Sequence, residues 1–536
     1  MTNHKKSFLL IFAASSLMLS CTKDFQDLNT KPDQPPSTTI APLMNGVIGT
    51  LVLPAQEQAA VHVDWMYPAT QLAGESALSG YLLLNGSSDI WNNYYHALQN
   101  INLIQDKING VTDQESMKNI QAILYVLRAY KTFRVTDVFG DIPFFNAGKT
   151  YTGDVSFYRP AYDDQKVIYD TLLSNLKWAV DNINTNSAAV TAAGNPYASL
   201  GAEETFFNND LSKWQKFANS LLLRYSMQMV EKDAAAATPY ITYALNKNLF
   251  IADGSDVGIW PATFGALDLA NRPWSFGSGG TGYLRISSTM WNLVADGRDS
   301  SEVFDPRAFI FADTNAFGKW APYTIGSPTA DKVNPYDYSG PVSNKKGALY
   351  SPLNFFLVVD RHYIPELIMT AAETHFLKSE AYMRGLGVAQ NTATAGTEYI
   401  AGVTASVTFW EFIAAHTNTA ESPWSTAQPK NYTPAQLVPL LANPKVMFTA
   451  DNAANLKKIY AQEWLDNFRQ PWLAFNLWRR TAATPMDPAA VEDASHATFY
   501  RLPYPQDEAV NNTDNYNAQI SKIGTNATNI KVWWMK

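Results

Sequence analysis

Amphipathic helical patterns at both ends of the chain are the feature that most restricts its fold. Apolar residues recur there at spacings of three and four, which is the period of a helix with one buried face. The patterns predict helices at residues 91–109, 112–133, 163–183, 212–231, 235–247, 365–385, 393–415 and 452–468. These helices follow one another in consecutive antiparallel pairs, a pattern that is compatible with a helical-repeat scaffold carrying an insertion.

The middle of the chain has a different character. Residues 250–362 are rich in Gly, Pro, Asn, Asp and aromatic residues and show little periodicity, as in "DGSDVGIWPATFGALDLANRPWSFGSGGTGYL". A long irregular stretch within a large domain is more often functional than idle. We therefore expect a loop-rich insertion on the helical scaffold that forms a ligand face.

One helix start carries a recognisable motif. Thr112 and Glu115 have the spacing of a capping box, in which a hydroxyl and a carboxylate bond to the free N–H groups of a helix start. We expect a helix to begin at this box and to bury apolar residues as far as Phe133.

The only cysteine, Cys21, stands at the end of a short apolar run. Lys5 and Lys6 precede residues 8–19, a run that is too short for a membrane span of about 20 residues but has the size of a secretory signal. The small residue before Cys21 and the apolar residues upstream resemble a bacterial lipobox, with Met18 where leucine is usual. The alternative is an ordinary signal peptide that is cut elsewhere.

These features predict how the chain is divided. Residues 1–20 are a signal peptide, and residues 21–37 are a lipidated tether that is polar and rich in proline. The rest of the chain, residues 38–536, is long enough for two or more ordinary domains or for one large helical array, and it contains the irregular segment at about 250–362.

Charge and cysteine content exclude several classes of protein. The formal net charge is −8 with both signs interspersed, so nucleic acid is not an expected partner. One cysteine cannot form a disulfide within the chain, and core burial must therefore stabilise the fold. No segment after residue 20 has the length and hydropathy of a membrane span.

No motif for an enzyme or a cofactor site fits its surroundings. "GSGGTG" at residues 277–282 has the dinucleotide-binding spacing, but no strand precedes it and no helix follows it. The chain has neither an H-E-x-x-H zinc motif nor a G-x-S-x-G nucleophile motif. We expect no catalytic residue, metal or cofactor. A surface glycosidase that uses two carboxylates remains the enzymatic alternative.

Aromatic residues in the irregular segments are the strongest sign of a binding function. The chain has 15 Trp, 27 Tyr and 27 Phe, and several of them lie among Asn, Asp and Arg in these segments. An aromatic face can stack on the C–H face of a sugar ring while polar side chains bond to its hydroxyl groups, and burial of one such face contributes on the order of 1–2 kcal/mol. The candidate ligand-binding residues are Trp65, Tyr81, Trp260, Asn271, Arg272, Trp274, Trp320, Tyr323 and Tyr336.

Eight stretches taken together resemble one protein family. They are "CTKDFQDLNTKPD", "LRAYKTFRVTDVFGDIPF", "KWQKFANSLLLRYSMQ", "DGRDSSEVFDPR", "AAETHFLKSEAYMRG", "NFRQPWLAFNLWRRTAATP", "RLPYPQDEAVNN" and the closing "VWW". In this order they are similar to the SusD/RagB family of outer-membrane nutrient-binding lipoproteins, nearer its SusD-like branch. The resemblance covers essentially the whole chain.

The resemblance implies both a fold and a role. The implied fold is mostly α: a scaffold of tetratricopeptide-like helix pairs on which loops build the ligand face, with residues 38–536 as a single helical domain. The role is capture of an oligosaccharide at the cell surface by a lipoprotein anchored in the outer membrane, and delivery to a TonB-dependent transporter of the SusC-like type. Peptides or other nutrients remain alternative ligands. Ligand-binding residues vary within the family, so the resemblance assigns none of them here.

Several charged residues inside the shared motifs are better interpreted as structural. We expect Arg479 and Arg480, in "LWRR", to pair with buried carboxylates or with helix ends. Glu373 and Glu380, on the predicted helix 365–385, are candidate partners.

Overall fold

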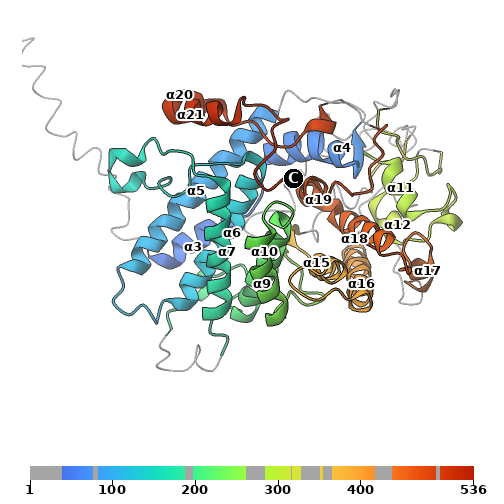
Figure 1. The fold of residues 1–536 in the computed structure, drawn as a ribbon, viewed down its shortest axis with the longest axis horizontal. Helices are drawn as coiled ribbons and strands as arrows, with labels where there is room; N and C mark the ends of the chain where they lie inside the picture. The colour runs from blue at the N-terminus through green and yellow to red at the C-terminus, as the bar shows by residue number, and fades with distance from the viewer. Residues whose placement is uncertain are drawn as a thin grey trace, which may run out of the picture.

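The computed structural model describes residues 39–75, 83–186, 197–260, 284–315, 317–326, 350–353, 365–416, 437–490 and 495–536. This part of the chain is mostly helical, which confirms the predicted fold class (Figure 1). The predicted signal peptide, the predicted tether and Cys21 lie outside the described residues.

Five helices form the first half of the scaffold. Each packs against the next along the chain, and the first three lie side by side in the blue-to-green part of Figure 1. They are α5 (Leu83–Asn109), α6 (Lys118–Phe139), α7 (Gln165–Asn182), α9 (Leu211–Met229) and α10 (Ala234–Lys247). Helix α3 (Ile40–Gly49) packs against α5.

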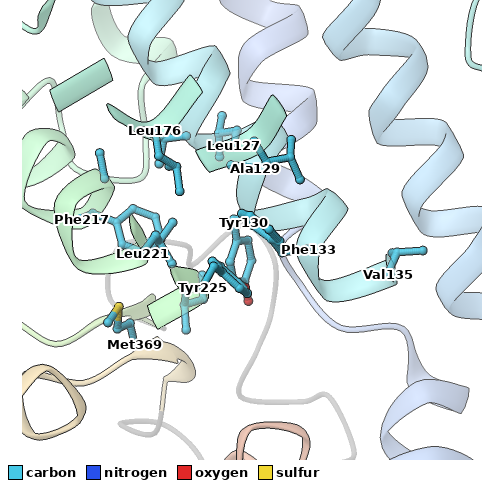
Figure 2. Packing of buried hydrophobic residues seen from close by; sticks show 14 of the residues in the cluster. Leu127, Ala129, Tyr130, Phe133, Val135, Leu176, Phe217, Leu221, Tyr225 and Met369 are labelled. Atoms are coloured by element: carbon cyan, nitrogen blue, oxygen red, sulfur yellow. The ribbon is translucent and has the colours of Figure 1, made fainter. Parts of the chain in front are cut away.

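Helix α6 lies at the centre of this group because apolar residues occur on all of its sides. Figure 2 shows its side chains packed against residues of α7, α9 and the strand that ends at Met369. The ring of Phe133 stacks on Tyr225 of α9 with centroids 3.7 Å apart, and it meets Tyr169 of α7 edge-on at 4.7 Å. Helix α6 therefore connects α7 and α9 within the largest hydrophobic cluster.

A second group of helices completes the scaffold. Helix α15 (Ala371–Arg384) packs against α16 (Thr392–His416) and α18 (Asn452–Asp466), and α18 is followed by α19 (Pro471–Thr481). Both α15 and α19 also contact α9, so the two groups share a continuous interface (Figure 1).

Shorter elements connect and cover these groups. They are the π-helix Glu57–Met66, α4 (Tyr67–Thr70), α11 (Ser288–Val294), α12 (Arg307–Phe311), α17 (Leu437–Ala442), α20 (Gln506–Asn511) and α21 (Thr513–Ile523). Among the described residues, no helix is both long enough and apolar enough to cross a membrane.

Two small antiparallel sheets lie in and beside the irregular middle. Strand β1 (Ala73–Glu75) pairs with β3 (Leu284–Ile286), and Ala73 lies opposite Ile286. Strand β2 (Val257–Ile259) pairs with β4 (Glu366–Met369), and Ile259 lies opposite Glu366.

Strand β4 corrects the predicted helix at residues 365–385. Its apolar residues pair with β2, and the helix α15 begins only at Ala371. Thr370 has extended backbone angles, and its side chain accepts a hydrogen bond from the N–H of Glu373, which makes it the N-cap. A pairing partner more than a hundred residues away therefore replaced the first turn of the predicted helix.

The capping box predicted at Thr112 and Glu115 is also wrong. The helix α6 begins at Lys118, and the N–H of Ser116 donates to the carboxylate of Asp113 in the turn before it. Glu115 instead pairs with Lys118 at 2.7 Å. The turn satisfies its own polar groups, and the helix starts three residues after the box.

The arginines that we interpreted as structural have structural partners. Arg480 lies 2.7 Å from the buried carboxylate of Glu380, and Arg224 lies 2.5 Å from Glu373. Arg479 donates at 2.7 Å to the main-chain oxygen of Asp137, near the C-terminal end of α6. The contacts of Arg480 and Arg479 confirm the predicted pairing with a buried carboxylate and a helix end, whereas Glu373, predicted as a partner of these arginines, pairs with Arg224 instead.

The carboxylate of Asp137 collects partners from distant parts of the chain. It accepts hydrogen bonds from the hydroxyl of Tyr169, from the amide of Asn476 at 3.1 Å and from the indole of Trp534 at 3.1 Å. Burial nevertheless raises the pKa of Asp137 to about 6. Helices α6, α7 and α19 and the C-terminal segment thus meet at one buried group.

Candidate functional site

A cavity of about 370 Å³ lies beside Trp260, directly after β2. The indole of Trp260 is partly buried, and its Nε1 donates to the main-chain oxygen of Asp256 at 3.3 Å. Its ring centroid lies 6.3 Å from that of Phe409 and 6.2 Å from that of Phe412, in both cases edge-on. The three rings form the aromatic walls of the cavity.

One face of α16 supplies most of the remaining wall. Five of its residues line the cavity at the spacing of a single helix face: Thr404, Ala405, Thr408, Phe409 and Phe412. The residues Val403, Val407 and Trp410, on other sides of the same helix, are buried in the core. The side chain of Phe412 is 46% exposed. Helix α16 therefore presents a second apolar face besides the one it needs for packing.

Sequence reasoning missed Phe409 and Phe412. The signal that could have identified them is that apolar residues occur all round the helix at 393–415, although a helix on the surface of a protein needs only one apolar stripe. The second stripe marks a face that either packs or binds.

Two carboxylates complete the cavity. The Oδ1 of Asp256 accepts from the N–H of Ala371 at 2.9 Å, which fixes this carboxylate at the start of α15. Burial raises the pKa of Asp256 to about 6, and the nearby carboxylates of Asp466 and Asp253 add to the shift. Asp253 is more exposed and lies 3.2 Å from the ring of His375.

The combination of groups suits a ligand that is apolar on its faces and polar on its edges. Trp260 and Phe412 can cover a carbon face, while two hydroxyl groups and two carboxylates can bond to polar groups around it; Phe409, which is only 6% exposed, packs in the core beside them. In the part of the chain that the structure describes, no three His, Cys, Asp or Glu side chains are grouped to hold a metal ion.

The structure places Trp320 in a packed position. Its ring stacks on Trp291 at 4.9 Å and meets Phe309 at 5.7 Å, and its Nε1 donates to the hydroxyl of Ser300 at 3.0 Å. The side chain is only 6% exposed. Trp320 thus belongs to the core formed by α11, α12 and their neighbours.

Tyr323 is also buried, at 1% exposure. Its ring lies against Gly74 of β1 and meets Tyr350 at 5.1 Å. Its backbone N–H donates to the oxygen of Ile286, and its own oxygen accepts from the N–H of Ser288, both at 2.8 Å. The segment therefore extends the β1–β3 sheet, and the ring packs on it.

Trp65 is partly buried and packs at a third place. Its ring meets His496 at 5.0 Å and Phe499 at 5.2 Å. Of the four candidate aromatic residues that the structure describes, only Trp260 lines the 370 Å³ cavity.

The other candidate residues lie outside the described residues. They are Tyr81, Asn271, Arg272, Trp274 and Tyr336. The segment 261–283, which carries three of them, follows Trp260 directly and precedes β3. The segment 76–82, which carries Tyr81, follows β1, and Glu75 of β1 lies opposite Leu284 of β3. These two segments are therefore attached to neighbouring strands.

Residues 28–505 match the model of the SusD-like family that is described as "Starch-binding associating with outer membrane". Because the match covers most of the chain, this chain belongs to the SusD-like family, as the eight sequence stretches indicated. The description associates the family with the outer membrane. A comparison with curated proteins found no match.

Solved structures share the fold over nearly the whole chain. A chitin-binding protein aligns with a TM-score of 0.68 and 20% identity, covering 93% of this chain and 100% of its own. A SusD homolog from Parabacteroides distasonis gives a TM-score of 0.69 and 19% identity, with 93% and 98% covered. A chitin-binding SusD homolog from Flavobacterium johnsoniae gives 0.66 and 20%, with 92% and 97% covered. At these identities the likeness shows the fold.

Proposed function

We propose that this protein is a non-enzymatic lipoprotein that captures a glycan at the cell surface. Membership of the SusD-like family supports this proposal, as do the two relatives of the same fold that are named chitin-binding. The observation that carries it is the cavity walled by Trp260, Phe409 and Phe412, which combines aromatic faces with hydroxyl and carboxylate groups.

The glycan is held by stacking and hydrogen bonds in this proposal. Trp260 and Phe412 cover the C–H faces of sugar rings, while Thr408 and Asp253 bond to the hydroxyl groups at the edge. The segment 261–283 follows Trp260 directly in the sequence, so Asn271, Arg272 and Trp274 are proposed to extend the same ligand face. Trp320 and Tyr323 support the fold and are not included.

The partner and the membrane anchor form part of the same proposal. Acylated Cys21 holds the protein in the outer membrane through the tether 21–37, with the single helical domain 38–536 facing the exterior. Captured glycan passes to a TonB-dependent transporter of the SusC-like type. Because acyl chains contribute about 0.8 kcal/mol per buried methylene, more than one chain keeps the protein in the membrane.

Calorimetric titration tests the capture step. The form that lacks residues 1–21 retains every described residue, and it would be titrated with a panel of neutral plant, host and microbial polysaccharides. We expect saturable binding of one glycan without hydrolysis, and an affinity at least about tenfold lower for Phe412→Ala.

The matched control is Phe145→Ala, the same substitution at a residue that is 39% exposed outside the cavity. It should bind as the unmodified protein does. Equal affinity of all three proteins would reject the Trp260 cavity as the site. Binding of peptides in place of every glycan would favour the peptide alternative. Release of sugar products, lost in Asp256→Asn, would favour the glycosidase.

The anchor has its own test. We expect Cys21→Ala to abolish acylation and to release the protein from the outer-membrane fraction, as measured by metabolic labelling with a fatty acid and by fractionation. Normal labelling and normal surface display of this variant would contradict the lipoprotein proposal.

A further inference from the structure

A second cavity, of about 400 Å³, shares no lining residue with the Trp260 cavity. It is formed where the turn at Gly140, the start of α7, the helix α21 and the C-terminal segment meet. Its lining carries several charged side chains and the indole ring of Trp533. None of these residues takes part in the proposed capture site.

Arg501 is the unusual residue in this lining, because it is a buried cation without an anionic partner. Its side chain is 2% exposed, and its Nε donates to the main-chain oxygen of Leu502 at 3.0 Å. Its Nη2 has no hydrogen-bond partner, and its guanidinium lies 4.3 Å from the ring centroid of Tyr504. Among the described residues, no carboxylate side chain forms an ion pair with Arg501. A buried charge with such incomplete pairing is costly, and an anion in the cavity would relieve the cost.

The acidic residues of the lining both pair with a cation other than Arg501. Lys522 lies 2.7 Å from Asp141 and also pairs with Asp164. Asp141 accepts two further hydrogen bonds, from the N–H of Gln165 at 2.8 Å and from the amide of Gln519 at 3.2 Å. The two carboxylates therefore bond to Lys522 and to the start of α7, and neither forms an ion pair with Arg501.

Two further features add positive potential. Lys531 is exposed at the cavity and donates to the main-chain oxygen of Lys536 at 2.7 Å. The helix α7 begins at Gln165, and its N-terminal turn, which carries the positive end of the helix dipole, forms part of the same wall. A helix start alone would not define a site, but here it adjoins the incompletely paired Arg501.

We propose that this cavity binds the carboxylate-bearing sugar ring of an acidic saccharide such as a uronate. Arg501 and Lys531 receive the carboxylate, Trp533 covers one carbon face of the ring, and Gln519 bonds to a hydroxyl group. The volume suits a small ligand rather than a protein segment. The choice of a saccharide rests on the proposed function; the choice of an anionic one rests on the charges of the cavity.

Tryptophan fluorescence provides the measurement, because Trp533 forms part of the wall. The protein without residues 1–21 would be titrated with trigalacturonate at low ionic strength. We expect a saturable change in fluorescence that is absent in Trp533→Phe. Lys531→Gln and Arg501→Lys should each weaken binding at least about tenfold, because each loses a charge or a forked pair of donors. The exposed Lys531 can be replaced without disturbing the core, so the test does not depend on the folding of the Arg501 variant.

Lys457→Gln is the matched control, since it removes the same charge from an exposed position on α18 outside this cavity. Affinity of Lys531→Gln and Arg501→Lys equal to that of Lys457→Gln would overturn the proposal. Equal binding of a neutral galactose trisaccharide would also overturn it, as would saturation by inorganic phosphate at the same concentration, which would indicate a general anion site. Phe412→Ala should bind trigalacturonate normally. Failure of trigalacturonate to bind can therefore be distinguished from failure of the neutral polysaccharides to bind at the Trp260 cavity.

Discussion

Trp260 and Trp320 satisfy the same sequence criterion, yet they occupy opposite kinds of environment. Both are tryptophans in the irregular stretch 250–362. Around Trp320, the rings of Trp291 and Phe309 and the hydroxyl of Ser300 leave the residue only 6% exposed, whereas Trp260 meets its neighbours edge-on and borders a cavity of about 370 Å³. The difference teaches that the partners supplied by neighbouring helices, rather than the residue type or its loop position, decide whether an aromatic residue packs or binds.

The largest expected effect is loss of stability at Trp320. Trp320→Ala should lower the free energy of unfolding by about 3–5 kcal/mol, because it leaves a large cavity in a closed core. Urea unfolding monitored by circular dichroism measures this loss. The folded fraction should still bind glycan with unchanged affinity. A loss below about 1 kcal/mol would contradict the assignment of Trp320 to a closed core.

The second prediction concerns Asp256, which has no counterpart beside Trp320. Its pKa is raised from 3.8 to about 6, so the folded protein holds a proton there that the unfolded chain has already released. The free energy of unfolding should therefore fall as the pH rises from about 4 to 6, by up to about 3 kcal/mol, and this cost persists above pH 6.

Asp256→Asn should remove this part of the pH dependence and stabilise the protein at pH 7, because the amide oxygen can still accept from Ala371. Urea unfolding at pH 4.5 and pH 7 provides the comparison. Asp253→Asn is the control, since that carboxylate is 66% exposed. An identical pH slope in the Asp256→Asn variant and the unmodified protein would contradict the prediction.

The third prediction tests how tightly Tyr323, which follows closely after Trp320 in the chain, is packed. A Cβ at Gly74 would lie 2.3 Å from the Cδ1 of Tyr323, and that ring is held by two backbone hydrogen bonds of its own residue. Gly74→Ala should cost about 1–3 kcal/mol in thermal or urea unfolding. Gly49→Ala, where nothing lies within 4 Å of the new carbon, should cost nothing. Equal stability of both variants would mean that Tyr323 is free to move.

The smallest effect is expected at Trp260. Trp260→Ala should reduce glycan affinity about tenfold, or about 1.4 kcal/mol, while it destabilises the fold less than Trp320→Ala does. Calorimetric titration and urea unfolding on the same preparation separate the two quantities. A stability loss equal to that of Trp320→Ala, with glycan affinity unchanged, would reverse the assignment of the two regions.

The helices could be predicted from the sequence because their signals are local. The expected helix at about 163–183 is observed as Gln165–Asn182, and the expected helix 235–247 as Ala234–Lys247. Strand β4 could not be predicted, since its apolar residues pair with β2 over a hundred residues earlier. The capping box at Thr112 failed because a nearby aspartate offered the turn another bonding pattern.

The candidate site was predictable only in part. Trp260 was identified because it is an aromatic residue in an irregular segment rich in polar residues. Phe409 and Phe412 were missed because they lie in a helix whose apolar residues resemble core positions. Which face of α16 packs depends on where α15, α18 and the residues before β2 are placed, and that is tertiary information. The missing hydrogen-bond partner of Arg501 Nη2 could not be predicted from the sequence either, because the surroundings of Arg501 are set by a C-terminal segment that shows no periodicity.

The bond from Trp534 to Asp137 has a consequence for the order in which the chain can fold. The two residues are 397 positions apart, so a chain made from its N-terminus holds a completed α6 long before the indole exists. Until then the buried carboxylate lacks one of its three side-chain donors, although Tyr169 and Asn476 can already bond to it, and the first helices do not reach their full stability. The segment that carries Trp534 therefore completes this buried group only after every described helix has been made.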